Sequence, residues 1–285
     1  AGAGFQIYRP DGSKVEMTFT YPTPTTIDTF YTNAEGYLVT PEKLEYGSGY
    51  SLVEVQAPYG YVLNNEPKDV ELTYAGQEFE VRDTVNTAFE NEYQSVRISL
   101  SKVMENDELF GIYGKDYYTS IRFGLFAAED ITAADGSVIP ADGLLSEVSL
   151  AENMTAKFDV QIPFGRYYVQ EIATDEHYVL NGEKYLVNFE YMGQDIRTAD
   201  IDCGQFVNLL KRGRIEGHKV DDKSEPLENA VFGLFTADCV KFSRDTAIMT
   251  AASDENGYFV FDEIPYGEYI IHEIESPRGY ILSGK

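Results

Sequence analysis

The stretches YSLVEVQAPYGYVLN (residues 50–64), YYVQEIATDEHYVLN (residues 167–181) and YIIHEIESPRGYILS (residues 269–283) are three copies of one motif. In each copy a Glu stands four residues after the first Tyr and seven residues before the second. These glutamates are Glu54, Glu171 and Glu273. A spacing that is kept in three otherwise divergent segments indicates repeated units of similar fold.

The residues that lead to each Glu roughly alternate between apolar and polar, which predicts a β-strand with one face toward a core. With a period of two, Tyr50, Leu52 and Glu54 share a face of the first strand. A single Glu at such a position is most simply explained by a solvent face or a strand end. Because its spacing to both tyrosines recurs three times, we expect this Glu to have a specific function.

Two other residue types recur around the motif. An Asn follows each of the first two glutamates by 37 residues, at Asn91 and Asn208. A Lys precedes the aromatic strand FGLF of the second and third copies, at Lys102 and Lys219. The order Lys, aromatic strand, Glu, Asn is complete only for the second copy.

These motifs resemble the Cna protein B-type or SpaA-type domains of Gram-positive surface proteins and pilins, whose E-box reads roughly Tyr-x-Leu-x-Glu-x-x-Ala-Pro-x-Gly-Tyr. The first copy fits throughout, and the third changes Leu to Ile and Ala to Ser. The second keeps both tyrosines and the Glu but has lost the Pro and the Gly. The resemblance implies a prealbumin-like β-sandwich in which a Lys on the first strand and an Asn on the last form an intramolecular isopeptide bond, promoted by the E-box Glu.

For the second copy, the resemblance implies a bond between Lys102 and Asn208, with Glu171 handling the protons. Burial disfavours the charged form of a lysine, so a buried Lys102 would supply the neutral amine that the attack needs. A protonated Glu171 could donate to the Asn208 carbonyl and then shuttle protons as ammonia leaves. The alternative is a Lys102 that reaches solvent and an Asn208 that is an ordinary capping amide.

The outer copies hold incomplete sites. The first has Glu54 and Asn91 without a lysine-bearing strand, and the third has Lys219 and Glu273 without an asparagine-bearing strand. We expect these units to be less stable than the middle one, with open sheet edges that missing segments or neighbouring molecules complete.

The fold class that follows is all-β, with tandem prealbumin-like (Ig-like) β-sandwich modules. We expect modules at residues 1–93, lacking its first strand, at 94–211, complete, and at 212–285, lacking its last strands. Their joints have almost no linker, which favours a semi-rigid rod. The segment LLSEVSLAENM from Leu144 is the nearest candidate for a short helix, although a loop fits as well.

Composition narrows the function. A net charge of −26 argues against partners such as nucleic acid or an anionic membrane surface. No apolar run is long enough for membrane insertion, no Cys and His spacing suits a metal, and no motif calls for a cofactor. The residues hold no nucleophile and base pair of an enzyme that acts on other molecules. Only the autocatalytic bond formation remains.

We therefore expect a structural stalk or pilin-backbone segment of an extracellular protein attached to a Gram-positive cell wall. Its partners would be other modules of the same surface protein or pilus. The alternative is an adhesin module that binds a host protein or glycan through exposed aromatic loops, with DELFGIYGKDYYTS (residues 107–120) as the best candidate. A decorated hairpin or an interdomain wedge is the simpler interpretation of that segment.

Overall fold

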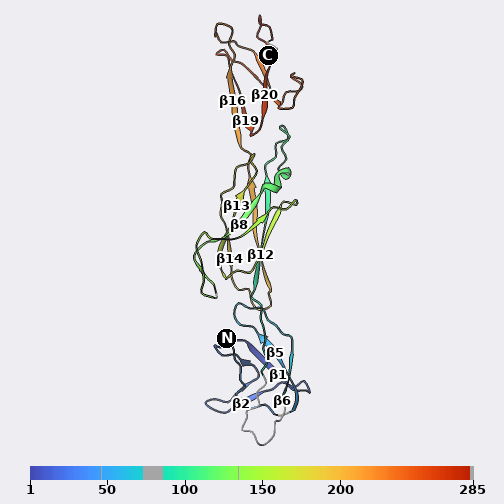
Figure 1. The fold of residues 1–285 in the computed structure, drawn as a ribbon, viewed down its shortest axis with the longest axis vertical. Helices are drawn as coiled ribbons and strands as arrows, with labels where there is room; N and C mark the ends of the chain where they lie inside the picture. The colour runs from blue at the N-terminus through green and yellow to red at the C-terminus, as the bar shows by residue number, and fades with distance from the viewer. Residues whose placement is uncertain (46, 73–85, 134, 283–285) are drawn as a thin grey trace.

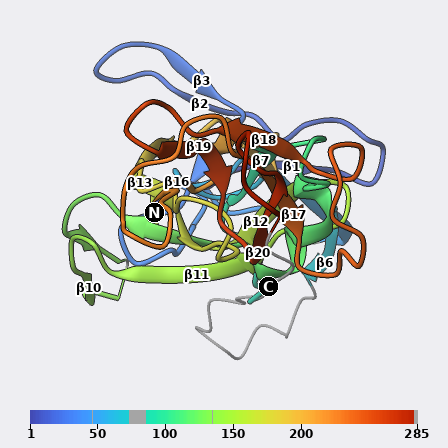
Figure 2. The same cartoon turned by 90° about the horizontal axis from the view of Figure 1, so that it is seen from above.

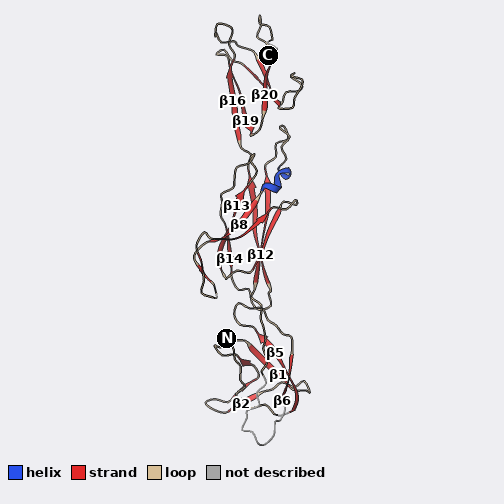
Figure 3. Ribbon diagram, in the orientation of Figure 1, coloured by secondary structure: helices blue, strands red, loops and turns tan. Residues whose placement is uncertain are grey.

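The computed structural model describes residues 1–45, 47–72, 86–133 and 135–282. The strands gather in three groups along an elongated molecule, with the chain ends in the two outer groups (Figure 1). Seen from above, the groups overlap in projection, as expected for units in series (Figure 2). Strands dominate every group, and the one helix of the described residues lies in the middle group (Figure 3). The all-β prediction is confirmed.

The N-terminal group contains one antiparallel sheet in the order β4-β1-β5-β6 and a separate β2-β3 hairpin. Its strands are β1 (Gly4–Tyr8), β2 (Met17–Phe19), β3 (Thr25–Ile27), β4 (Phe30–Tyr31), β5 (Gly47–Gln56) and β6 (Lys68–Leu72). The aromatic strand β1 lies beside β5, which carries Glu54.

The middle group is a sandwich of two sheets, β11-β8-β13-β14 and β12-β7-β15, with a β9-β10 hairpin. Its elements are β7 (Ser95–Met104), the 3₁₀ helix η1 (Gly114–Ser120), β8 (Arg122–Ala127), β9 (Ile131–Thr132), β10 (Val138–Ile139), β11 (Leu144–Ser149), β12 (Thr155–Val160), β13 (Gly165–Ala173), β14 (Tyr185–Phe189) and β15 (Thr198–Asn208). The first strand β7 and the last strand β15 are parallel neighbours.

The C-terminal group pairs β16 with β19 and orders its second sheet β18-β17-β20. Its strands are β16 (Arg212–His218), β17 (Val231–Thr236), β18 (Met249–Ala252), β19 (Tyr258–Pro265) and β20 (Tyr269–Glu275). Within the described part of the chain, β16 has a strand partner on one side only, whereas its counterpart β7 has one on both sides. The expected module boundaries after residues 93 and 211 fall between the three groups, and the division into three modules stays a prediction.

Residues 144–149 form an edge strand rather than a helix, because Leu145 and Val148 pack on the core while pairing with β8. In residues 107–120, Phe110, Tyr117 and Tyr118 pack against the middle core instead of pointing into solvent. Phe110 also packs against the C-terminal core, which favours the wedge interpretation of this segment.

The joint between the N-terminal and middle groups is held by two glutamines. The side chain of Gln94, which is 1% exposed, donates to the carbonyls of Gly193 and Ile196 at 3.1 and 2.6 Å. Gln194 reaches in the other direction, and its Oε1 accepts a hydrogen bond from the Ala57 backbone N–H at 2.9 Å. The turn after the first Glu strand is thus bonded to a loop of the middle group.

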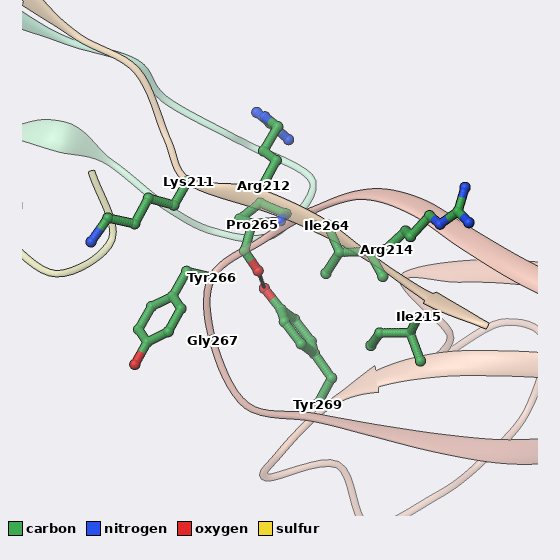
Figure 4. A pocket seen from close by; sticks show the side chains of 10 residues that line it. Lys211, Arg212, Arg214, Ile215, Ile264, Pro265, Tyr266, Gly267 and Tyr269 are labelled. Carbon is green, nitrogen blue, oxygen red and sulfur yellow. Dashed lines mark hydrogen bonds between the residues drawn. The ribbon is translucent and has the colours of Figure 1, made fainter. Parts of the chain in front are cut away.

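The joint between the middle and C-terminal groups centres on Arg212. Its guanidinium contacts Glu105 at 2.7 Å and Asp107 at 2.9 Å, both from the middle group, and donates to the Glu263 carbonyl of the C-terminal group. A hollow of about 250 Å³ lies here, where the Tyr269 hydroxyl donates to the Pro265 carbonyl (Figure 4). One cation therefore bridges both groups, and we expect its contacts to restrict bending at this joint.

The cores differ in size, which predicts an order of stability. Among the described residues, the middle core contains 21 buried apolar residues, against five in the N-terminal core and four in the C-terminal core. Because local stability follows buried apolar contact, backbone amides of β7, β8 and β13 should exchange with solvent more slowly than those of β1, β5, β17 and β20. Hydrogen exchange read by mass spectrometry checks this, and equal protection in all three groups would contradict it.

Replacing Arg212 should loosen the second joint. Arg212→Ala removes charged hydrogen bonds worth roughly 1.5–3 kcal/mol each and leaves Glu105 and Asp107 without their cation. Small-angle scattering should then show a broader range of molecular lengths, and a protease should cut residues 209–213 faster. Arg214→Ala is the matched control, since that exposed side chain pairs only with Glu216 of its own strand. Unchanged scattering for Arg212→Ala would mean that the joint is held otherwise.

Candidate functional site

Strand alternation places Lys102 inside the middle sandwich. On β7, Val96, Ile98 and Leu100 are buried, and the next inward position is Lys102, whose side chain has no exposed surface. The neighbouring outward position, Val103, is 40% exposed. The period of two that buries three aliphatic side chains thus buries a lysine as well.

The same alternation places Glu171 and Asn208 inside the sandwich. On β13, Tyr167 and Val169 precede Glu171 on the inner face, as the motif predicted. On β15, Phe206 and Asn208 point inward, and Asn208 is 1% exposed. Glu171 comes from one sheet of the sandwich, whereas Asn208 and the lysine come from the other.

The three side chains are in direct contact. Lys102 Nζ lies 2.8 Å from Glu171 Oε1 and 2.6 Å from Asn208 Oδ1. Asn208 Nδ2 donates to both oxygens of Glu171, at 3.0 and 2.9 Å. The structure therefore brings together the three residues that the sequence singled out for the second copy.

The surroundings of the amine are apolar. Lys102 Nζ lies 5.7 Å from the centre of the Phe123 ring, which itself packs edge-on against Phe206. Burial lowers the pKa of Lys102 below its ordinary value, although the hydrogen bond and charge of Glu171 oppose this. A lowered pKa makes the neutral amine easier to reach, and the neutral amine is the nucleophilic form.

The orientation of the amide differs from the expected one. The nitrogen of Asn208, not its carbonyl oxygen, faces Glu171, and the carbonyl oxygen faces Lys102. In this arrangement Glu171 touches both the amine that must lose protons and the nitrogen that would leave as ammonia. The carboxyl group is thus placed for proton transfer between them rather than for polarising the carbonyl.

Two residues at this site were missed by the sequence analysis. The Asn181 backbone N–H donates to Glu171 Oε2 at 2.8 Å, and the Thr174 hydroxyl accepts a hydrogen bond from Asn208 Nδ2 at 2.8 Å. A signal for Asn181 was present, because the first two copies both end in VLN, ten residues after their Glu. The Asn64 N–H makes the equivalent hydrogen bond, to Glu54 Oε2 at 3.0 Å.

The N-terminal site has the carboxylate and the amide. Glu54 is fully buried, and its Oε2 accepts a hydrogen bond from Asn91 Nδ2 at 2.7 Å. Asn91 also donates to the Val62 carbonyl at 2.9 Å. Glu54 Oε1, the counterpart of an oxygen that binds Lys102 in the middle site, is buried and has no hydrogen-bond partner among the described residues.

The C-terminal site has the carboxylate and the amine. Lys219 Nζ lies 2.9 Å from Glu273 Oε2, and these side chains are 22% and 10% exposed. Glu273 Oε1 and Ser276 Oγ are buried without a hydrogen-bond partner in the described part of the chain. Glu54 Oε1 is the third such atom in the described part of the chain, so two of the three are oxygens of the motif glutamates.

Other kinds of site have less support. No group of three or more His, Cys, Asp or Glu that could hold a metal occurs within the described ranges. None of the helices described is long and apolar enough to cross a membrane.

A family model for the SpaA prealbumin-like fold domain matches residues 1–87 and 213–285. Among solved structures, the Bacillus anthracis TIE protein is 21% identical with a TM-score of 0.67, and the alignment covers 100% of this chain and 44% of that one. BcpA, the major pilin subunit of Bacillus cereus, is 18% identical over 97% of this chain and 84% of its own, with a TM-score of 0.32. A C-terminal fragment of the pilus adhesin SpaC from Lactobacillus rhamnosus GG is 14% identical over 64% and 77%, with a TM-score of 0.38. No curated protein matches the chain.

The buried charges of the middle site predict that a second substitution offsets part of the stability lost through the first. Lys102→Met leaves Glu171 buried without its cation, whereas Lys102→Met with Glu171→Gln leaves no charge in the site. Neither variant has the amine, so covalent chemistry does not enter the comparison. The double variant should be more stable by roughly 2 kcal/mol or more, because an uncompensated buried charge is costly.

Hydrogen exchange of the β13 amides measures this for the middle unit alone. Lys157→Met, at an exposed lysine of β12, is the control and should change stability by less than about 0.5 kcal/mol. A double variant that is no more stable than the single one would show that Glu171 needs no cation.

Proposed function

Because the chain belongs to the SpaA family of prealbumin-like fold domains, we propose that it is a structural segment of a Gram-positive surface protein, a stalk or pilin backbone. Its middle unit is locked by a spontaneous isopeptide bond between Lys102 and Asn208. The segment is extracellular, is attached to the cell wall through its parent protein, and has other modules of that protein or pilus as partners. It is no enzyme toward other molecules.

One observation carries this proposal, namely the buried contact of an amine, an amide and a carboxylate inside a single sandwich. A lysine and a glutamate without exposed side-chain surface are rare in a domain core, because both charges lose their hydration. A structural ion pair would not need an asparagine in contact with both partners. An amide-forming reaction needs all three.

Glu171 carries each proton of the proposed reaction. It takes a proton from the Lys102 ammonium group, which leaves a neutral amine and a carboxylic acid. The amine attacks Cγ of Asn208 and forms a tetrahedral adduct. Glu171 gives its proton to Asn208 Nδ2 and takes the second proton from the Lys102 nitrogen, the C–N bond breaks, and ammonia leaves. The products are one amide bond, one ammonia and a protonated Glu171, and no cofactor is consumed.

Folding brings the reacting groups into contact and so lowers the barrier to the reaction. Holding two reacting groups in contact replaces roughly 7 to 11 kcal/mol of activation free energy in well-oriented cases. The bond would join residues 106 positions apart. The chain-entropy model developed for disulfides assigns a loop of that length on the order of 4 to 5 kcal/mol of stabilisation, and reducing agents would not open this bond.

The outer units fit a structural segment that joins further modules at both ends. Each holds a preformed half of the site, with Asn91 on Glu54 in one and Lys219 on Glu273 in the other. A lysine-bearing or an asparagine-bearing strand, from another segment of the protein or from a neighbouring molecule, would complete them. The acidic surface, with a net charge of −26, keeps such a stalk hydrated and apart from anionic polymers.

The intact mass of the chain tests the proposal. Wild type should be lighter than its calculated mass by one ammonia, and a digest should contain one linked peptide pair with Lys102 and Asn208. Glu171→Ala should have the calculated mass, because no group remains to carry the protons. Glu54→Ala is the matched control and should still lack one ammonia. A wild-type mass equal to the calculated value would refute the proposed bond.

A further inference from the structure

The leaving nitrogen of the middle site is held on both of its N–H groups. One side of Asn208 Nδ2 faces the two oxygens of Glu171, at 3.0 and 2.9 Å. In the other direction it donates to Thr174 Oγ1 at 2.8 Å. Thr174 is half-buried, whereas the side chains of Lys102 and Glu171 are fully enclosed. The hydroxyl that accepts this hydrogen bond therefore belongs to a residue that is partly exposed.

The position of this hydroxyl recurs in the motif. Thr174 follows Glu171 by three residues, and Ser276 follows Glu273 by three residues. Ser276 Oγ is buried and has no hydrogen-bond partner in the described part of the chain. The C-terminal unit thus has a buried hydroxyl at the same position of the motif, without a partner among the described residues.

The N-terminal unit differs at this position. Ala57 follows Glu54 by three residues and has no hydroxyl. There, Asn91 Nδ2 donates instead to the backbone carbonyl of Val62 at 2.9 Å. Both asparagines therefore have an acceptor for their second N–H group, a side-chain hydroxyl for Asn208 and a backbone carbonyl for Asn91. A hydroxyl residue occupies this position of the motif in the second and third units but not in the first.

We propose that Thr174 is a positioning residue for the isopeptide reaction, with Ser276 as its counterpart in the C-terminal unit; this inference rests on the proposed function. The hydroxyl accepts one N–H of Asn208 and fixes the nitrogen against Glu171. Accepting this hydrogen bond leaves more electron density on the nitrogen, which then takes a proton from Glu171 more readily. Thr174 keeps its own proton throughout and forms no bond to carbon.

The position also serves the exit of ammonia. The departing molecule starts in an enclosed site and must leave it before the reverse reaction can occur. Thr174 contacts the leaving nitrogen and is itself partly exposed, so ammonia can pass from Glu171 to the hydroxyl and then to water. A side chain of the same shape without the hydroxyl would offer no polar group on this path.

The test measures the rate of bond formation rather than its presence. The full chain is made by cell-free translation, quenched with acid at intervals, and digested, so that linked and unlinked peptides are counted by mass. Thr174→Val should slow the reaction by roughly tenfold, the effect of one hydrogen bond that becomes stronger in the transition state. Thr174→Ser should restore the rate to within about twofold. Thr155→Val, at an exposed hydroxyl of β12, is the matched control.

Folding is followed in the same samples by near-ultraviolet circular dichroism, so that a folding defect is separated from slow chemistry. Should Thr174→Val hinder folding, the comparison of Thr174→Ala with Thr174→Ser decides in its place. Folded variants that link as fast as wild type, or a serine variant as slow as the valine one, would overturn the role of the hydroxyl. A wild type that never loses ammonia would instead refute the proposed function.

Discussion

The burial of one lysine amine among apolar side chains is the constraint on which the middle unit depends. Lys102 can stay there because Glu171 and Asn208 arrive from β13 and β15 with the right register. A slip of any of these strands by one residue would turn its inner side chains outward and leave a buried charge without a partner. The site therefore selects one strand register as much as the core does.

The three units share a strand that carries a glutamate, and they differ in whether a lysine, an asparagine or both contact that glutamate. Each has a glutamate near the end of a strand, buried in the first two units and partly buried in the third, and in the first two a backbone N–H ten residues later donates to its Oε2. In the described part of the chain, Glu54 Oε1, Glu273 Oε1 and Ser276 Oγ are buried without a hydrogen-bond partner. Such atoms are costly when buried, so a complementary donor or acceptor at these positions would stabilise the outer units.

Much of this arrangement could be predicted from the sequence. The alternation before Glu171 predicted its inward position, and the constant interval to Asn208 predicted that the two belong to one site. The direction of the amide and the contact with Thr174 could not be predicted, because they depend on how two sheets approach each other. Residues 144–149 were misjudged since their apolar positions suit a short helix as well as an edge strand.

The parallel pairing of β7 with β15 also decides how the unit responds to tension. Because the neighbouring first and last strands run in the same direction, the chain enters at one end of the sandwich and leaves at the other. A pull along the rod then slides these strands past each other lengthwise. Without a covalent link between the two strands, their backbone hydrogen bonds share that load and must break together, whereas strands peeled apart from one end would lose them one at a time.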